Sequence, residues 1–171
     1  VEVEADLAIP AFGQPFRELC LAIRDLAEHF AAEGVQFVYP VHLNPNVQAP
    51  VRELLADLPN VHLLDPLDYH SLVQMLKRAA LVLTDSGGIQ EEAPTFGVPV
   101  LVMREATERP EGLEANVARL VGTSRQRIVS EAERLLRDPE AHAAMARGGN
   151  PYGDGHAAER IMAILLERGA R

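Results

Sequence analysis

Short apolar runs rich in β-branched residues recur along most of the chain. Glycine, proline or polar residues bound each run, which is typical of strands buried in a sheet. The clearest runs cover residues 34–40, 61–64, 80–84 and 98–103, and a weaker one covers residues 118–121. The alternating start of the chain, VEVEADLAI, predicts a first strand within residues 1–9. The pattern therefore predicts about six strands.

Amphipathic helical patterns fill the intervals between these strands. They cover residues 15–32, 50–58, 69–78 and 88–96, and after Gly122 the chain reads as helical over residues 124–137, 139–147 and 156–168. Such alternation implies right-handed crossovers and a parallel sheet with helices on both faces. We expect a single α/β domain over residues 1–171, with a doubly wound parallel sheet, three α/β/α layers and a helical C-terminal end.

The common strand order of doubly wound sheets, 3-2-1-4-5-6, reverses between the first and the fourth strand. Ligands bind at this switch point, outside the carboxyl ends of the two strands. The pattern thus selects two loops before their chemistry is considered, at residues 9–13 and 85–88.

Composition and charge narrow the classes of function. The 171 residues include 16 Lys and Arg against 25 Asp and Glu, which gives a net charge of −9. Nucleic acids and anionic membranes bind basic surfaces, so neither is an expected partner. The lone Cys20, on the apolar side of the first helix, excludes an internal disulfide and a cysteine-based zinc site. Without a membrane-spanning run or a signal peptide, we expect a cytoplasmic protein. No histidine pair has metal-ligand spacing, and we expect neither a metal nor a cofactor.

Residues 85–88 carry the chemistry that a switch-point loop requires. Ser86 is suited to cap the following helix, Gly87 and Gly88 let a ligand approach the backbone, and the first-turn N–H groups favour phosphate. A tight turn into a helix needs the same residues, so both interpretations stay open. Glu91 and Glu92 either stabilise the helix dipole or accept hydrogen bonds from ribose hydroxyls.

Two arginines follow the fifth strand, in the segment REATERPEG. Arg104 and Arg109 are candidate partners for an anion, because the forked guanidinium suits phosphate. Pairing with the glutamates of the same segment is the alternative. Residues 42–46 suit a structured turn, and the glycine-rich residues 150–155 suit a connector into the last helix.

Four segments together resemble the non-hydrolysing UDP-N-acetylglucosamine 2-epimerases. They are PVHLNPNV (residues 40–47), TDSGGIQEEAPTFGVPVLVMREATERPEG (84–112), LVGT (120–123) and NPYGDGHAAERI (150–161). The resemblance runs from about Phe12 to the C-terminus. Members of that family have two Rossmann-like domains of the GT-B type and interconvert UDP-GlcNAc and UDP-ManNAc by eliminating and re-adding UDP. This chain looks like the C-terminal, UDP-binding half.

The resemblance also implies roles for individual residues. Ser86, Gly87 and Gly88 would contact the diphosphate, and Glu92 would contact the ribose. Arg109 would belong to the nucleotide site, with Leu67 and Leu72 placed where the family surrounds the uracil.

The chain departs from the family in two respects. The N-terminal domain, which supplies most of the family's catalytic acids and bases, is absent, and residues 7–11 (LAIPA) are apolar where the family has a basic, nucleotide-contacting segment. We hypothesise an excised domain with a rebuilt, engineered N-terminus; a diverged natural homologue is the alternative. An exposed apolar patch at residues 7–12 would favour a homodimer.

Three functions remain open at this point. The first is a UDP-binding part that does not catalyse turnover and holds UDP or UDP-GlcNAc with an affinity of about 1 mM. The second is an engineered scaffold or interaction protein with a vestigial site. The third is an active epimerase once another chain supplies the missing domain. We favour the first, because turnover needs acids and bases assembled by domain closure.

Overall fold

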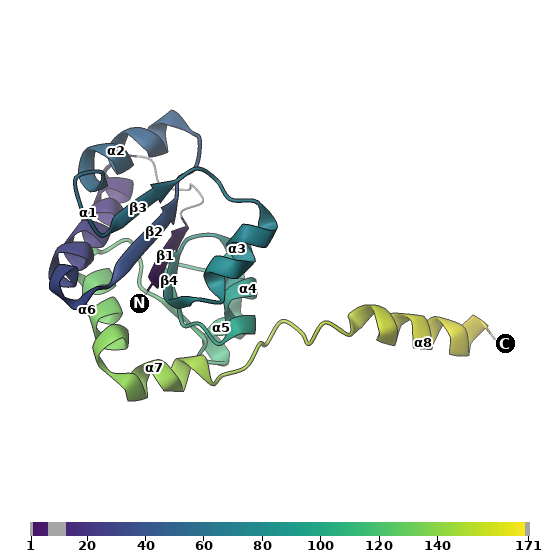
Figure 1. Ribbon diagram of the computed structural model, residues 1–171. Coiled ribbons are helices and arrows are strands. Elements are labelled where there is room, and N and C mark those ends of the chain that lie inside the picture. Colours follow the sequence, from purple (N-terminus) through teal and green to yellow (C-terminus); the bar gives the residue numbers. More distant parts are fainter. Residues whose placement is uncertain (1, 7–12, 170–171) are drawn as a thin grey trace.

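A six-stranded parallel sheet forms the centre of the molecule (Figure 1). The computed structural model describes residues 2–6 and 13–169. The strands are β1 (Glu2–Asp6), β2 (Gln36–Pro40), β3 (Val61–Leu64), β4 (Ala79–Thr84), β5 (Val100–Val102) and β6 (Ala118–Leu120). Their order is β3-β2-β1-β4-β5-β6, and every neighbouring pair is parallel. The predicted doubly wound, Rossmann-like arrangement is confirmed.

Helices cover both faces of the sheet and complete the three layers (Figure 1). One face carries α1 (Gln14–His29), α2 (Pro45–Leu55), α6 (Arg125–Arg137) and α7 (Pro139–Ala146). The other carries α3 (Tyr69–Leu76), α4 (Gly87–Glu92) with the 3-10 turn Ala93–Phe96, and α5 (Pro110–Glu114). A further 3-10 turn, Ala31–Glu33, follows α1.

Strand β4 shows why the central strands read as unbroken apolar runs. Leu81 and Leu83 pack into the core beneath α1 and α6, whereas Val82 packs into the core beneath α3 and α4. Successive side chains of a strand point to opposite faces, so a strand covered on both faces must be apolar at every position.

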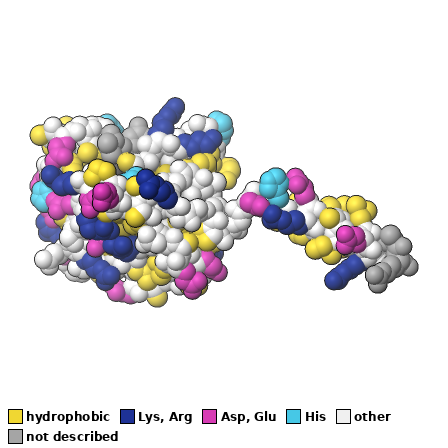
Figure 2. Space-filling model, turned by 90° about the horizontal axis from the view of Figure 1, so that it is seen from below, with side chains coloured by type: hydrophobic (Ala, Val, Ile, Leu, Met, Phe, Trp, Pro, Cys, Tyr) yellow, Lys and Arg dark blue, Asp and Glu magenta, His cyan; other side chains and the backbone are white. Residues whose placement is uncertain are grey.

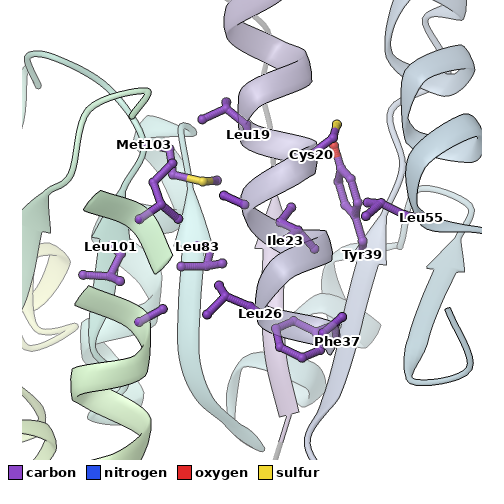
Figure 3. Packing of buried hydrophobic residues seen from close by; sticks show 14 of the residues in the cluster. Leu19, Cys20, Ile23, Leu26, Phe37, Tyr39, Leu55, Leu83, Leu101 and Met103 are labelled. Carbon is purple, nitrogen blue, oxygen red and sulfur yellow. The ribbon is translucent and has the colours of Figure 1, made fainter. Parts of the chain in front are cut away.

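The larger core lies between α1 and the sheet (Figure 3). Leu26 of α1 lies beside Leu83 of β4 and Phe37 of β2 (Figure 3). Cys20 lies one to two turns earlier, above Tyr39 (Figure 3). All five side chains are at most 1% exposed, which confirms that Cys20 belongs to the core.

Two helix predictions need correction. The helix expected at residues 50–58 begins at Pro45, because the Asn44 side chain accepts a hydrogen bond from the Asn46 N–H at 2.9 Å and Pro45 fills the first helical position. Pro50, taken as the start, lies inside the helix. The segment after β5 contains a short helix, α5, whose five residues are too few to show a helical period.

The last helix, α8 (Ala157–Gly169), projects away from the rest of the molecule (Figures 1 and 2). Its large apolar side chains are 50–67% exposed: Ile161, Met162, Ile164, Leu165 and Leu166. Their spacing of three and four residues makes one wide apolar stripe. Within the described part of the chain, no helix has the length and apolar character required to cross a membrane.

Burial of Cys20 predicts an unreactive thiol. The side chain is 0% exposed, and burial raises the pKa of the thiol to about 12, so the nucleophilic thiolate is scarce at neutral pH. We expect negligible labelling of the folded chain by Ellman's reagent at pH 8, and one thiol per chain in guanidinium chloride, which serves as the control. Rapid stoichiometric labelling under native conditions would contradict this packing.

The projection of α8 predicts that the helix adds little to the stability of the domain. We expect a chain ending at Gly155 to unfold with a free energy within about 0.5 kcal/mol of the full chain in urea. We also expect the full chain, but not the shortened one, to self-associate in sedimentation velocity, because exposed apolar patches associate.

A full-length control keeps the length of the chain. The pair Ile161→Glu and Leu165→Glu places charges on the apolar stripe and should reduce self-association as the deletion does. A clear loss of unfolding free energy on deletion would show instead that α8 packs on the domain.

Candidate functional site

The turn between β4 and α4 lies at the switch point of the sheet. Asp6 at the end of β1 is in register with Thr84 at the end of β4, so both strands end at the same edge. Residues 7–12, which continue from β1 and include the apolar segment 7–11, lie outside the described residues. The predicted position of residues 85–88 at the carboxyl edge is confirmed.

Two hydrogen bonds of its backbone hold Ser86 in place. Its N–H donates to Thr84 Oγ1 at 2.9 Å, and its carbonyl accepts from Gln90 Nε2 at 3.1 Å. Ser86 occupies the N-cap position of α4, but among the described residues its hydroxyl caps no N–H of the helix. The expectation that this side chain caps α4 is therefore wrong, and the first-turn N–H groups of Gly87 and Gly88 have no intrahelical acceptor.

The side chain of Arg109 lies against the start of α4. A Cβ placed on Gly87 would lie 3.8 Å from Arg109 Nη2. The Nε–H of Arg109 donates to Glu91 Oε1, and this hydrogen bond raises the pKa of the guanidinium above its usual value. The pair is 36% and 40% exposed. A charged arginine thus lies beside a turn whose first backbone N–H groups have no intrahelical acceptor, an arrangement that favours an anion.

Arg104 pairs with a glutamate of its own segment, which is the alternative to binding an anion. Both of its terminal nitrogens donate to the carboxylate of Glu108, at 3.0 and 3.1 Å. Arg109, by contrast, lies beside α4 and takes its carboxylate partner, Glu91, from that helix, while its Nη1 donates to the Glu108 carbonyl at 3.4 Å.

Glu92 lies close to the same turn. A Cβ on Gly88 would lie 3.9 Å from Ser86 Oγ and 4.0 Å from Glu92 Oε1, so both side chains flank this glycine. Glu92 Oε2 is buried and accepts no hydrogen bond from the residues that the structure describes. A buried carboxylate oxygen without a donor is unfavourable, and a hydroxyl that reached it would satisfy it.

The two leucines predicted near uracil belong to the connection after β3 and to α3. Leu67 is partly buried in the connection between β3 and α3. Leu72, within α3, packs against the smaller core that contains Ile89 of α4. Asp68 between them caps α3, and the hydrogen bond from the Ser71 N–H lowers the pKa of its carboxyl. The role of the leucines stays a prediction.

Sequence reasoning missed a buried polar connection beside Arg109. The Thr107 hydroxyl donates to Gln90 Oε1 at 2.6 Å and accepts from the Arg109 N–H at 3.1 Å. Gln90 is only 1% exposed. The available signal was a glutamine on the buried side of α4, next to Ile89, where the helical pattern calls for an apolar residue.

The segment at residues 150–155 does more than connect α7 with α8. Asn150 Nδ2 donates to Thr95 Oγ1 at 2.7 Å, and the Tyr152 hydroxyl donates to the Arg109 carbonyl at 3.5 Å. A Cβ on Gly112 would lie 2.6 Å from that hydroxyl, so only glycine lets the ring pack there. Burial raises the pKa of Tyr152, which keeps the phenol protonated as a donor.

The remaining candidate segment, residues 42–46, contains a local hydrogen bond. In the turn at residues 42–46, the Asn44 N–H donates to His42 Nδ1 at 3.1 Å, as a structured turn requires. Across residues 2–6 and 13–169, no group of three or more metal-binding side chains forms a potential metal site.

Comparison with known proteins shows the family to which this chain is similar. The family model described as UDP-N-acetylglucosamine 2-epimerase matches residues 11–166. The UDP-N-acetylglucosamine 2-epimerase of Escherichia coli K12 is 54% identical over 155 residues, which make up 91% of this chain and 41% of that protein. The chain therefore spans well under half the length of such relatives.

Solved structures of other proteins are similar to this chain in both fold and sequence. The UDP-GlcNAc 2-epimerase of Neisseria meningitidis, solved with UDP-GlcNAc bound, is similar with a TM-score of 0.91 and 40% identity, over 97% of this chain and 44% of that one. A Staphylococcus aureus protein, MnaA, solved with UDP, gives a TM-score of 0.92 at 36% identity, over 98% and 46%. This chain belongs to the UDP-N-acetylglucosamine 2-epimerase family and corresponds to the C-terminal part of its members.

Proposed function

We propose that this chain binds the UDP portion of UDP-GlcNAc and is the nucleotide-binding part of an epimerase. The observation that carries the proposal is the position of Arg109 against Gly87, at the start of α4 and at the switch point of the sheet. The relatives solved with UDP-GlcNAc and with UDP share this fold at 40% and 36% identity, which supports the same class of ligand here.

The diphosphate fits the start of α4. Ser86, Gly87 and Gly88 present a hydroxyl and backbone N–H groups without bulky side chains, and Arg109 supplies a positive charge. Glu91 already balances that charge through its ion pair. A diphosphate must therefore share or displace Glu91, which lowers the affinity but leaves the backbone donors available.

The nucleoside fits the residues on either side. The carboxylate of Glu92 offers acceptors for the two hydroxyls of a ribose, and its buried Oε2 has no donor among the described residues. Leu67 and Leu72 offer partly buried apolar surface for the uracil. UDP-GlcNAc then places its sugar beyond the diphosphate.

Catalysis by this chain alone is not part of the proposal. The chain spans 41% of the E. coli relative, and epimerisation needs an acid and a base on both sides of the reacting carbon. An active epimerase therefore requires the remaining part of the protein, on the same or another chain. We propose weak binding without turnover for the 171-residue chain.

A titration of the ¹⁵N-labelled chain with UDP, followed with UDP-GlcNAc, tests the proposal. We expect saturable shifts confined to residues 86–92 and 104–112, with a dissociation constant of about 1 mM. Arg109→Ala should weaken binding about tenfold, because it removes one charge-assisted contact.

A matched arginine serves as the control. Arg137 of α6 pairs with Glu33 at 2.7 Å and lies at the opposite edge of the sheet, so Arg137→Ala removes the same charge from the chain without touching the site. It should change the affinity less than twofold. A well-dispersed spectrum that does not respond to 20 mM UDP, about 20 times the expected constant, would reject the binding function and favour the scaffold interpretation.

A further inference from the structure

A continuous hydrogen-bonded chain connects Arg109 with the turn at Ser86. The Arg109 N–H donates to Thr107 Oγ1 at 3.1 Å, and the Thr107 hydroxyl donates to Gln90 Oε1 at 2.6 Å. The Gln90 amide group in turn donates to the Ser86 carbonyl at 3.1 Å. Each group uses the donor or acceptor that its chemistry provides, so the direction of the chain is fixed.

The connection joins two parts of the molecule that secondary structure does not join. Gln90 and Ser86 belong to the start of α4, whereas Thr107 and Arg109 belong to the irregular segment after β5. Gln90 is 1% exposed, and in such surroundings a hydrogen bond is hard to replace with water. The Thr107 hydroxyl therefore supplies a buried connection between this segment and α4, beside the more exposed ion pair of Arg109 with Glu91.

Further contacts hold the carbonyl and the guanidinium of Arg109. The Tyr152 hydroxyl donates to its carbonyl, and the guanidinium pairs with Glu91 above Gly87. Its backbone, with φ −121° and ψ 63°, lies outside the helical and strand regions. Pro110 disfavours the helical region for the residue before it, and the contacts of the Arg109 N–H and carbonyl hold the backbone in the conformation observed.

We propose that Thr107 and Gln90 are positioning residues that hold Arg109 over the start of α4 for the nucleotide diphosphate. The inference rests on the proposed UDP binding, since it concerns the geometry of that same site. Neither side chain needs to touch the ligand. They act by keeping the guanidinium where the diphosphate and the backbone N–H groups meet, so that little ordering is left for the binding step.

The test compares isosteric and conservative substitutions in the UDP titration of the 171-residue chain. Thr107→Val keeps the shape but removes the hydroxyl, which leaves Gln90 Oε1 and the Arg109 N–H without their partner. We expect the dissociation constant for UDP to rise about tenfold. Thr107→Ser restores the hydroxyl and should restore most of the affinity.

A double-mutant cycle shows whether the effect passes through Arg109. In the Arg109→Ala background we expect Thr107→Val to change the affinity less than twofold, because there is no guanidinium left to position. An equal loss in both backgrounds would overturn the inference, since it would show a general structural effect. Equal affinity of the Thr107→Val and the unsubstituted chain would overturn it too.

A readout without nucleotide separates this inference from the proposed function. The Nε–H signal of Arg109, paired with Glu91, should be sharp in the unsubstituted chain and in Thr107→Ser, and broadened or shifted in Thr107→Val. An unchanged signal in Thr107→Val would overturn the positioning role. Failure of the unsubstituted chain to bind UDP would reject the proposed function, whatever this signal shows. If Thr107→Val yields little folded chain, Gln90→Met removes the same acceptor from the helix side.

Discussion

The parallel pairing of β1 with β4 is the constraint on which the proposed site depends. Asp6 and Thr84 are in register, so the connections that leave the two strands begin next to each other. β2 and β3 extend the sheet from one side of this pair, and β5 and β6 extend it from the other. The crossovers therefore diverge at this point and leave the carboxyl edge accessible. At another position in the sheet, the same Ser86 turn would be an ordinary entry into a helix.

Binding of an anion by a chain with a net charge of −9 has to rely on local features. Backbone N–H groups at the start of α4 are fixed dipoles, and they attract phosphate whatever the total charge of the molecule. Arg104 is occupied by Glu108, which leaves Arg109 as the guanidinium beside that turn. In the proposed site, Arg109 is the cation beside the turn, so we expect its position to matter more than the number of basic residues in the chain.

The order of the elements was predictable because the central strands are buried on both faces. Strand β4 must be apolar at each inward position, and such a run is visible without any structure. The start of α2 was missed because two prolines compete as first helical residues, and only the cap at Asn44 selects Pro45.

The sequence names candidate residues for the site, but it does not give the contacts between them. Several glutamates lie near Arg109 in the sequence, yet its partner is Glu91, 18 positions away and on another element. Thr107 and Gln90, 17 positions apart, meet for the same reason. Spacing along the chain does not encode which elements pack together, so these pairs follow from the fold alone. We propose that these contacts order Arg109 before any ligand binds. The entropy cost of fixing its position then falls on the folding of the chain and not on the binding of the ligand. We therefore expect the proposed site to keep affinity for a diphosphate although the chain covers only 41% of a relative's length.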